Sequence, residues 1–236
     1  MDKEKLIKEI RNYCKKNSDK KVVLKYSRYF KDGFDAYGLG REKFEYKLNS
    51  LLKEGKLNQR IIFDAAPELL KSGKFEETSY AILLLRGFTK EFNKKTFQKI
   101  ETWFRYGINN WAHSDSLSLD IISALLLSKT IELKELSGWR KAKNKFQRRC
   151  SAVSLIKYIK AGKSQKNCLK FIEPLMKDTA REVQQGTGWF LRELWKINNT
   201  DTEEFLLKWK DTAPRLIFQY ATEKMTASEK KKFKKE

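Results

Sequence analysis

Apolar side chains recur at helical spacing along most of the chain. Between residues 3 and 17, Leu6, Ile10, Tyr13 and Cys14 follow one another at short intervals that place them on one face of a helix. Strand-like alternation of apolar and polar residues is scarce, and three prolines and eleven glycines leave room for few tight turns. The pattern therefore predicts an all-α fold.

The same pattern predicts a succession of helices separated by short polar breaks. A less regular aromatic stretch at 24–40 ends in Gly38-Leu39-Gly40, a turn that leads into the next helix, which Gly55 is placed to end. We expect helices at 3–17, 41–54, 57–71 (bent or split by Pro67), 75–86, 90–107, 115–129, 144–161, 164–178, 179–198, 201–211 and 214–224.

The predicted helices fall into pairs of roughly 35–40 residues, a period typical of HEAT-type repeats. One amphipathic pair cannot bury its apolar stripe alone, so pairs stack into an array with a concave face. We therefore expect a HEAT-like helical-repeat solenoid (an α-α superhelix) with a basic concave face. Residues 1–225 would form it as a single domain, and 226–236 would be a basic C-terminal tail, frayed and solvated from Lys230 to Lys235. No residue motif repeats clearly, so an irregular helical domain is the alternative.

Composition changes this picture by pointing to a partner. The net charge is +21, although 40% of the residues are apolar and the chain can bury a core. Like charge on this scale opposes folding, so it indicates a polyanionic partner, and six tryptophans add flat surfaces that can stack on bases. No apolar run is long enough for a membrane span, and the first residues do not form a signal peptide. The three cysteines are odd in number and widely spaced, which favours a reducing cytoplasm over a disulfide framework or a cysteine-rich zinc site.

A first candidate site lies in the segment from Asn109 to Asp115. Trp111 and Asp115 are one helical turn apart, at the start of the helix predicted for 115–129. A helix N-terminus favours an ionised carboxylate. In one interpretation Asp115 faces a positive charge on a substrate beside Trp111. In the other, Asp115, Ser114 or Ser116 is the N-cap of the helix.

A second candidate site lies between Val183 and Leu194. On a helical wheel Phe190, Leu191, Leu194 and Ile197 form an apolar stripe, and Trp189 lies opposite with Arg192 and Lys196. Such a tryptophan suits stacking on a nucleotide, and packing against a neighbouring repeat is the alternative. Gly186 and Gly188 indicate a helix start where the backbone can approach a ligand or another helix.

Arg148 and Arg149 lie beside a third apolar stripe, formed by Ala152, Leu155, Ile156 and Ile159. A guanidinium there can clamp a phosphate with two hydrogen bonds. It can equally form a structural ion pair, and the wheel does not distinguish the two arginines.

These segments resemble the DNA alkylation repair family, the AlkD-like glycosylases built of HEAT-like repeats. Asn110-Trp111-x-x-x-Asp115 resembles the family's Asn-Trp-x-x-x-Asp signature, and Gly188-Trp189-Phe190-Leu191-Arg192-Glu193 resembles its Gly-Trp-x-Leu-Arg-Glu signature. Arg149 lies where the family's arginine would be. Tyr29-Phe30 and Tyr37-Gly38-Leu39 are similar to its N-terminal segment.

The resemblance implies a monofunctional DNA glycosylase that needs no cofactor and no metal. It would hydrolyse the N-glycosidic bond of cationic purines such as 3-methyladenine and 7-methylguanine, in double-stranded DNA and without drawing the base into a deep pocket. It implies that Asp115 stabilises the cationic sugar and orients water, and that Trp111 and Trp189 hold the nucleotide between their faces. Contacts with DNA are expected from five side chains: Arg149, Arg148, Arg192, Lys196 and Tyr29. We expect a monomer.

The sequence departs from the family pattern at His113, which stands where an acidic or apolar residue is common. This histidine can be a DNA contact, a modulator of Asp115 or merely exposed. The block around it indicates a divergent branch, so a non-catalytic binder of damaged, distorted or branched DNA on the same scaffold is the alternative function. A HEAT-type protein-interaction scaffold is a third, which the charge disfavours unless its partner is strongly acidic.

Overall fold

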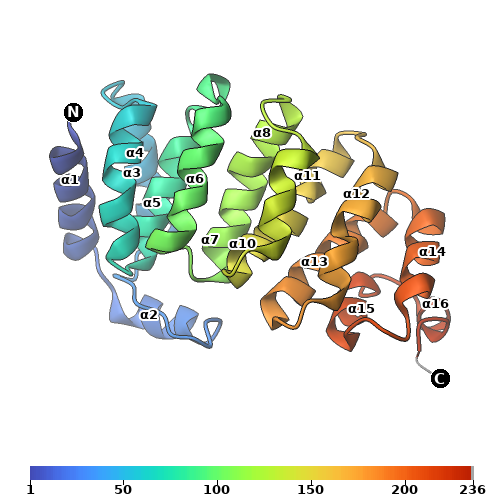
Figure 1. The fold of residues 1–236 in the computed structure, drawn as a ribbon. Coiled ribbons are helices and arrows are strands. Elements are labelled where there is room, and N and C mark those ends of the chain that lie inside the picture. The colour runs from blue at the N-terminus through green and yellow to red at the C-terminus, as the bar shows by residue number, and fades with distance from the viewer. Residues whose placement is uncertain (235–236) are drawn as a thin grey trace. The chain divides into compact units, whose positions relative to one another are not determined.

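Helices make up the regular structure of residues 1–234, the part of the chain that the computed structural model describes, and no strand occurs in that range (Figure 1). This confirms the predicted all-α class. The α-helices are α1 Lys3–Lys16, α2 Lys20–Ser27, α3 Arg41–Lys53, α4 Gln59–Lys71, α5 Phe75–Arg86, α6 Lys94–Tyr106, α7 Trp111–Ser116, α8 Ser123–Leu127, α9 Leu133–Leu136, α10 Lys145–Val153, α11 Leu155–Lys160, α12 Gln165–Ile172, α13 Arg181–Trp195, α14 Asn199–Trp209, α15 Arg215–Ala221 and α16 Ala227–Lys231.

Short turns of other helix types complete the regular structure. Three 3₁₀ helices, η1 Thr89–Glu91, η3 Ser137–Lys141 and η4 Glu173–Lys177, connect α-helices. The element η2, Leu117–Ile122, is a π-helical turn directly between α7 and α8. The single helix predicted for 115–129 is therefore wrong in detail, because it begins at Trp111 and changes its hydrogen-bond register on the way.

The chain divides into two compact units, Met1–Ser116 and Leu117–Glu236. In the first unit α4 packs against α1, α5 and α6, and α5 packs against α3 and α7. In the second unit α13 is the central helix, in contact with α10, α11, α14 and α15. The predictions of a single domain, of a superhelical solenoid and of a basic concave face stay predictions.

The core of each unit consists of the side chains that set the helical spacing. Leu6, Ile10 and Cys14 of α1 are buried, as their spacing predicts. Cys14, Cys150 and Cys168 are buried thiols outside any disulfide. Burial raises the pKa of the Cys168 thiol to about 12 and raises that of Cys14 further.

The helix α2 was not predicted, because its sequence buries nothing. None of its side chains is buried, and Leu24 is 73% exposed. In Figure 1, α2 lies across one end of the first unit. Its start is fixed to the next loop: the Asp19 N–H donates to the Tyr37 carbonyl (3.0 Å), and Gly38, at φ +85°, leaves no room for a Cβ beside the Asp19 carbonyl.

The C-terminal segment is ordered where the sequence predicts a frayed tail. Phe233 is buried and packs near Phe218, and Arg215 donates from Nη1 to the Phe233 carbonyl (2.8 Å). The prediction is therefore wrong for Phe233, because its ring finds an apolar partner on α15. Lys235 lies outside the described residues.

Candidate functional site

The helix α7 begins at the first candidate segment and is capped by Asn110. The His113 N–H donates to Asn110 Oδ1 (2.9 Å), the bond that an N-cap side chain makes to the first turn. The Ser114 N–H donates to the Asn110 carbonyl (3.2 Å). Asp115 is therefore inside the helix, and the interpretation of Ser114, Asp115 or Ser116 as the N-cap is wrong.

Trp111 lies in the first turn of α7 and is held in place on one side. Its ring stacks on Phe30 with 5.5 Å between centroids and 14° between planes, and its Nε1 donates to the Tyr29 carbonyl (3.2 Å). Phe30 in turn stacks on Phe34. The indole is still 40% exposed. It is thus an oriented aromatic surface that keeps room for a ligand.

Tyr29 lies beside this tryptophan through its backbone, and its side chain is 52% exposed. Arg28 donates from Nη2 to the Tyr29 hydroxyl (2.9 Å), and the guanidinium carbon lies 4.9 Å from the centre of the tyrosine ring. An aromatic ring next to an exposed cation suits contact with a nucleic acid. The structure therefore brings Tyr29 and Trp111 together in the first unit.

Asp115 follows Trp111 by one helical turn and is only 9% exposed. A buried carboxylate is uncommon unless it has partners or a role, because desolvation disfavours its charge. In a protein with a net charge of +21 this acid lies one turn from an exposed tryptophan.

His113 is buried, which excludes the exposed and DNA-contacting interpretations. It is 3% exposed, and its ring stacks on Phe75 with 4.6 Å between centroids. Burial lowers the pKa of His113 to about 4, although the hydrogen bond with the Phe75 carbonyl acts in the opposite direction. The imidazole is therefore neutral at physiological pH.

The second candidate segment forms most of α13, and its two glycines lie in the middle of this helix and not at its start. The helix begins at Arg181, and the two glycines serve close packing instead. A Cβ on Gly186 would lie 2.8 Å from Arg149 Cγ, and one on Gly188 would lie 2.6 Å from the Ile217 carbonyl oxygen. The predicted helix start is wrong, and the predicted close approach to another helix is confirmed.

The wheel for α13 holds with one exception. Phe190, Leu191 and Leu194 are fully buried, but Ile197 is 45% exposed because the helix ends at Trp195. Trp189 is half-buried. Part of its surface therefore faces solvent.

Arg148 forms the structural ion pair that the sequence left open. Its Nε and Nη2 donate to the two carboxylate oxygens of Asp178 (2.6 and 3.1 Å), and its Nη1 donates to the carbonyls of Ala142 and Lys143. Arg149 is 6% exposed, and its Nη1 donates to the Glu182 carbonyl (2.7 Å). This geometry favours the structural alternative for Arg148 and makes Arg149 part of the contact between α10 and α13.

Arg192 and Lys196 surround a buried carboxylate. Glu193 accepts hydrogen bonds from Arg192 Nε (3.3 Å) and Lys196 Nζ (2.9 Å), and Lys160 Nζ lies 2.8 Å from its second oxygen. Arg192 also pairs with Glu223. Burial alone would raise the pKa of Glu193, but the two lysines lower it to about 2. These cations are thus partly neutralised within the protein.

Sequence reasoning missed the residues that support Trp111. Phe75 contacts the rings of Phe30 and Phe34 as well as His113. Glu76, which is 4% exposed, accepts the N–H groups of Tyr37, Gly38 and Leu39 (2.9, 2.7 and 3.0 Å). An acid in the first turn of a helix is typical of any helix, so no local signal identifies this role.

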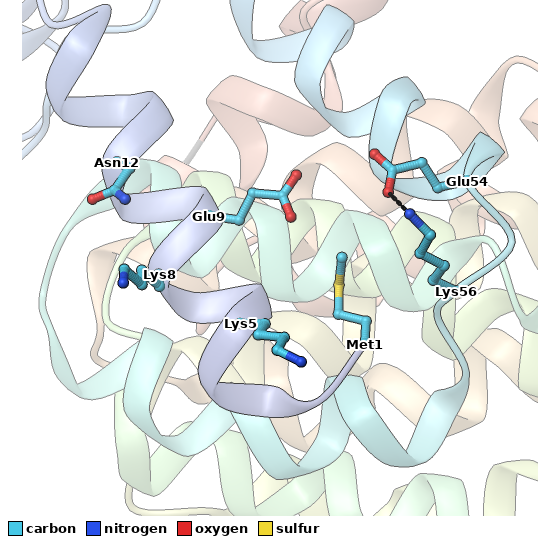
Figure 2. A pocket seen from close by; sticks show the side chains of 7 residues that line it. All are labelled: Met1, Lys5, Lys8, Glu9, Asn12, Glu54 and Lys56. Atoms are coloured by element: carbon cyan, nitrogen blue, oxygen red, sulfur yellow. Dashed lines mark hydrogen bonds and ion pairs between the residues drawn. The ribbon is translucent and has the colours of Figure 1, made fainter.

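Two further features of the described residues lie apart from this site. Figure 2 shows a hollow beside α1 where Lys5, Lys8 and Lys56 lie near Glu9 and Glu54. Both acids are paired, Glu54 with Lys56 (3.3 Å) and Glu9 with Lys47. Within residues 1–234, no cluster of three or more histidine, cysteine or acidic side chains has the arrangement of a metal site. No helix in that range has the length and apolarity needed to span a bilayer.

Together the fold and the site define an all-α protein in which an oriented tryptophan and a buried acid share one helical turn. A family model described as DNA alkylation repair enzyme matches residues 10–225. The chain belongs to this family. No match is found among curated proteins.

Solved structures share the fold. A predicted DNA alkylation repair enzyme from Enterococcus faecalis superposes with a TM-score of 0.77 at 19% identity, over 89% of this chain and 98% of that one. AlkD2 from Streptococcus mutans superposes with a TM-score of 0.60 at 19% identity, over 88% and 99%. At this identity the likeness shows the fold alone.

Proposed function

We propose that this protein is a DNA glycosylase that hydrolyses the N-glycosidic bond of alkylated, cationic purines such as 3-methyladenine and 7-methylguanine. The observation that carries the proposal is Asp115, a buried carboxylate one turn from the exposed indole of Trp111 in a chain with a net charge of +21. An anion opposes phosphate binding, whereas a carboxylate beside an exposed indole can stabilise positive charge that develops on a bound nucleotide. Membership of the DNA alkylation repair family supports the same conclusion.

The proposed reaction needs no general acid to assist departure of the base. An alkylated purine already carries a positive charge, so the bond from its nitrogen to the sugar C1′ breaks with the electron pair leaving on the base. The base departs neutral, and the positive charge passes to the deoxyribose. Asp115 stabilises this oxocarbenium-like sugar and orients a water molecule, which attacks C1′ and loses a proton. No covalent enzyme intermediate is needed.

Aromatic side chains bind the substrate. Trp111, fixed by Phe30 and the Tyr29 carbonyl, offers its exposed surface to the nucleotide and attracts the growing positive charge. Tyr29 and Trp189, both open to solvent, contact the DNA. Arg149, Arg192 and Lys196 contribute mainly through the electrostatic potential, because each already has a partner within the protein. The monomeric state and the cytoplasmic location stay predictions of the sequence.

Single-turnover release of 7-methylguanine from a methylated duplex tests the proposal. Wild type should release the base. Asp115→Asn should bind the duplex as wild type does and release the base roughly 10²–10³-fold more slowly, the usual loss when one transition-state electrostatic contact is removed. Asp64→Asn is the matched control, because Asp64 is half exposed and forms only a surface pair with Arg60 (3.7 Å).

Two outcomes contradict the proposal. Equal release by wild type and Asp115→Asn would remove the catalytic role of Asp115. No release by wild type, together with tight and salt-sensitive duplex binding, would make the protein a non-catalytic binder of damaged or branched DNA.

A further inference from the structure

His113 is the one histidine of the sequence, and the proposed reaction does not use it. It lies between Trp111 and Asp115 on α7, where it is 3% exposed and cannot touch a substrate. A buried imidazole costs free energy unless its two nitrogens are satisfied. Its partners therefore indicate what it does.

The contacts of His113 fix one tautomer of the ring. Nε2 lies 3.0 Å from the Phe75 carbonyl oxygen, which only accepts, so Nε2 carries the proton. Nδ1 lies 2.7 Å from Asn110 Nδ2, which only donates, so Nδ1 accepts. Ser79 Oγ lies 3.1 Å from Nε2 as a further partner on α5. The neutral ring thus links the cap of α7 to the first turns of α5.

A second route joins His113 to Trp111 through aromatic rings. The imidazole stacks on Phe75, Phe75 contacts Phe30 edge-on (5.6 Å), and Phe30 stacks on Trp111. His113 is therefore connected to the Trp111 indole in two ways, through the backbone of α7 and through the rings of Phe75 and Phe30.

The helix α5 provides a fixed frame for both routes. The Phe75 N–H donates to the Asp35 carbonyl (2.8 Å), and Lys74 pairs with Asp35 (2.5 Å). The Glu76 carboxylate holds the backbone of Tyr37, Gly38 and Leu39. The segment that carries Phe30 and the helix that receives His113 are thus fastened to each other.

We propose that His113 is a positioning residue, which sets the orientation of Trp111 and Asp115 by joining the first turn of α7 to α5 through its Nε2 hydrogen bond to Phe75. A side chain that merely filled the space would hold neither residue in register. The kinetic part of the test rests on the proposed glycosylase function, and the spectroscopic part does not.

Two variants separate the two ring nitrogens. His113→Gln places an amide N–H at the reach of Nε2 and keeps a donor for the Phe75 carbonyl. His113→Asn places an amide oxygen near the position of Nδ1, so it retains the bond from Asn110. Its NH₂ group is one carbon too short for the Phe75 carbonyl, so the bond to α5 is lost. If the link to α5 positions the turn, glutamine should replace histidine better than asparagine does.

The indole N–H signal of Trp111 in a ¹H–¹⁵N NMR spectrum reports its orientation, and its loss in Trp111→Phe assigns it. The signal should stay in place in His113→Gln, and it should shift and exchange faster with solvent in His113→Asn. A folded His113→Asn variant with the wild-type Trp111 signal would overturn the proposal. If that variant does not fold, the ring ¹⁵N signals of wild-type His113 decide, since a mobile ring or an Nδ1–H tautomer would also overturn it.

The kinetic measurement separates positioning from binding. In His113→Asn the single-turnover excision rate should fall about ten- to a hundredfold, because a small misplacement of reacting groups has effects of this size, and duplex affinity should change much less. His113→Gln should recover most of the rate. An equal loss in both variants would overturn the proposal. If wild type excises nothing, the proposed function fails alone, and the NMR result still decides the role of His113.

Discussion

Buried polar side chains decide how the first unit is held together. Glu76 accepts three backbone N–H groups, and Glu77, which is 1% exposed, accepts from Arg11 Nε (3.1 Å) and from the Tyr37 hydroxyl (2.7 Å). A carboxylate that accepts several hydrogen bonds from one loop stabilises the conformation of that loop. These acids therefore stabilise the loop that Trp111 depends on.

The first prediction at this scale concerns the stability of the fold at acid pH. The unfolded chain protonates His113 near pH 6.5, and the folded chain protonates it only near pH 4. Between these values the unfolded state binds more protons, so lowering the pH from 6.5 to about 4 removes up to roughly 3 kcal/mol of stability from this residue. Urea unfolding of wild type and His113→Gln at several pH values measures the effect. Wild type should lose stability relative to His113→Gln as the pH falls from 6.5 to about 4, and parallel profiles would contradict the assignment.

A second prediction concerns Glu76. Glu76→Gln replaces one carboxylate oxygen by an NH₂ group, which then faces either the Tyr37 N–H or the N–H groups of Gly38 and Leu39. We therefore expect a loss of about 1–3 kcal/mol in the free energy of unfolding. Glu45→Gln is the matched control, because Glu45 makes only an exposed pair with Arg41 (2.8 Å) and should change stability by less than about 0.5 kcal/mol. Urea unfolding measures both. Equal effects would contradict a stabilising role for the hydrogen bonds that Glu76 accepts.

At the scale of elements, α13 is the helix on which the second unit depends, and its packing depends on glycine. Gly188→Ala would bring a Cβ within 2.6 Å of the Ile217 carbonyl oxygen, and a backbone atom cannot move aside cheaply. We expect a loss of about 1–3 kcal/mol despite the better helix propensity of alanine. Gly138→Ala, where no atom lies within 4 Å of the added Cβ, should be neutral. Thermal unfolding compares them, and an equally stable Gly188→Ala would contradict the close contact.

Helices with a buried stripe were predictable, and local deviations from them were not. The stripe of Phe190, Leu191 and Leu194 follows from helical spacing. No such spacing predicts α2, because this helix buries no side chain. The sequence places the start of this helix at residue 115, but Asn110 caps it and the helix begins at Trp111. The helix then changes to π register at Leu117. No apolar pattern encodes such a change of register.

The site shows the same division. The motif predicts that Trp111 and Asp115 lie one helical turn apart, and the structure confirms that spacing. The ion-pair partner of Arg148 could not be predicted, because Asp178 is distant in sequence. The buried position of His113 was equally hidden, since its partners Phe75 and Ser79 lie on another helix. Pairing between distant residues depends on the tertiary fold.

At the scale of the whole molecule, the net charge of +21 predicts that the affinity for DNA depends strongly on the salt concentration. With a footprint of about six phosphates, duplex affinity should fall about a thousandfold when the salt concentration rises from roughly 50 to 200 mM, because binding releases counterions from the DNA. Fluorescence anisotropy with a labelled duplex measures this slope. A flat salt profile would favour a protein-interaction scaffold. Asp115→Asn should leave the slope unchanged.

The buried thiols of Cys14, Cys150 and Cys168 have a practical consequence. Reagents attack the thiolate, and the raised pKa values of Cys14 and Cys168 keep that form scarce, in addition to the barrier of burial. A single cysteine introduced on the surface should therefore accept a fluorophore or spin label selectively, without removal of the native cysteines. One label in each compact unit would allow the distance between the two units to be measured with and without DNA.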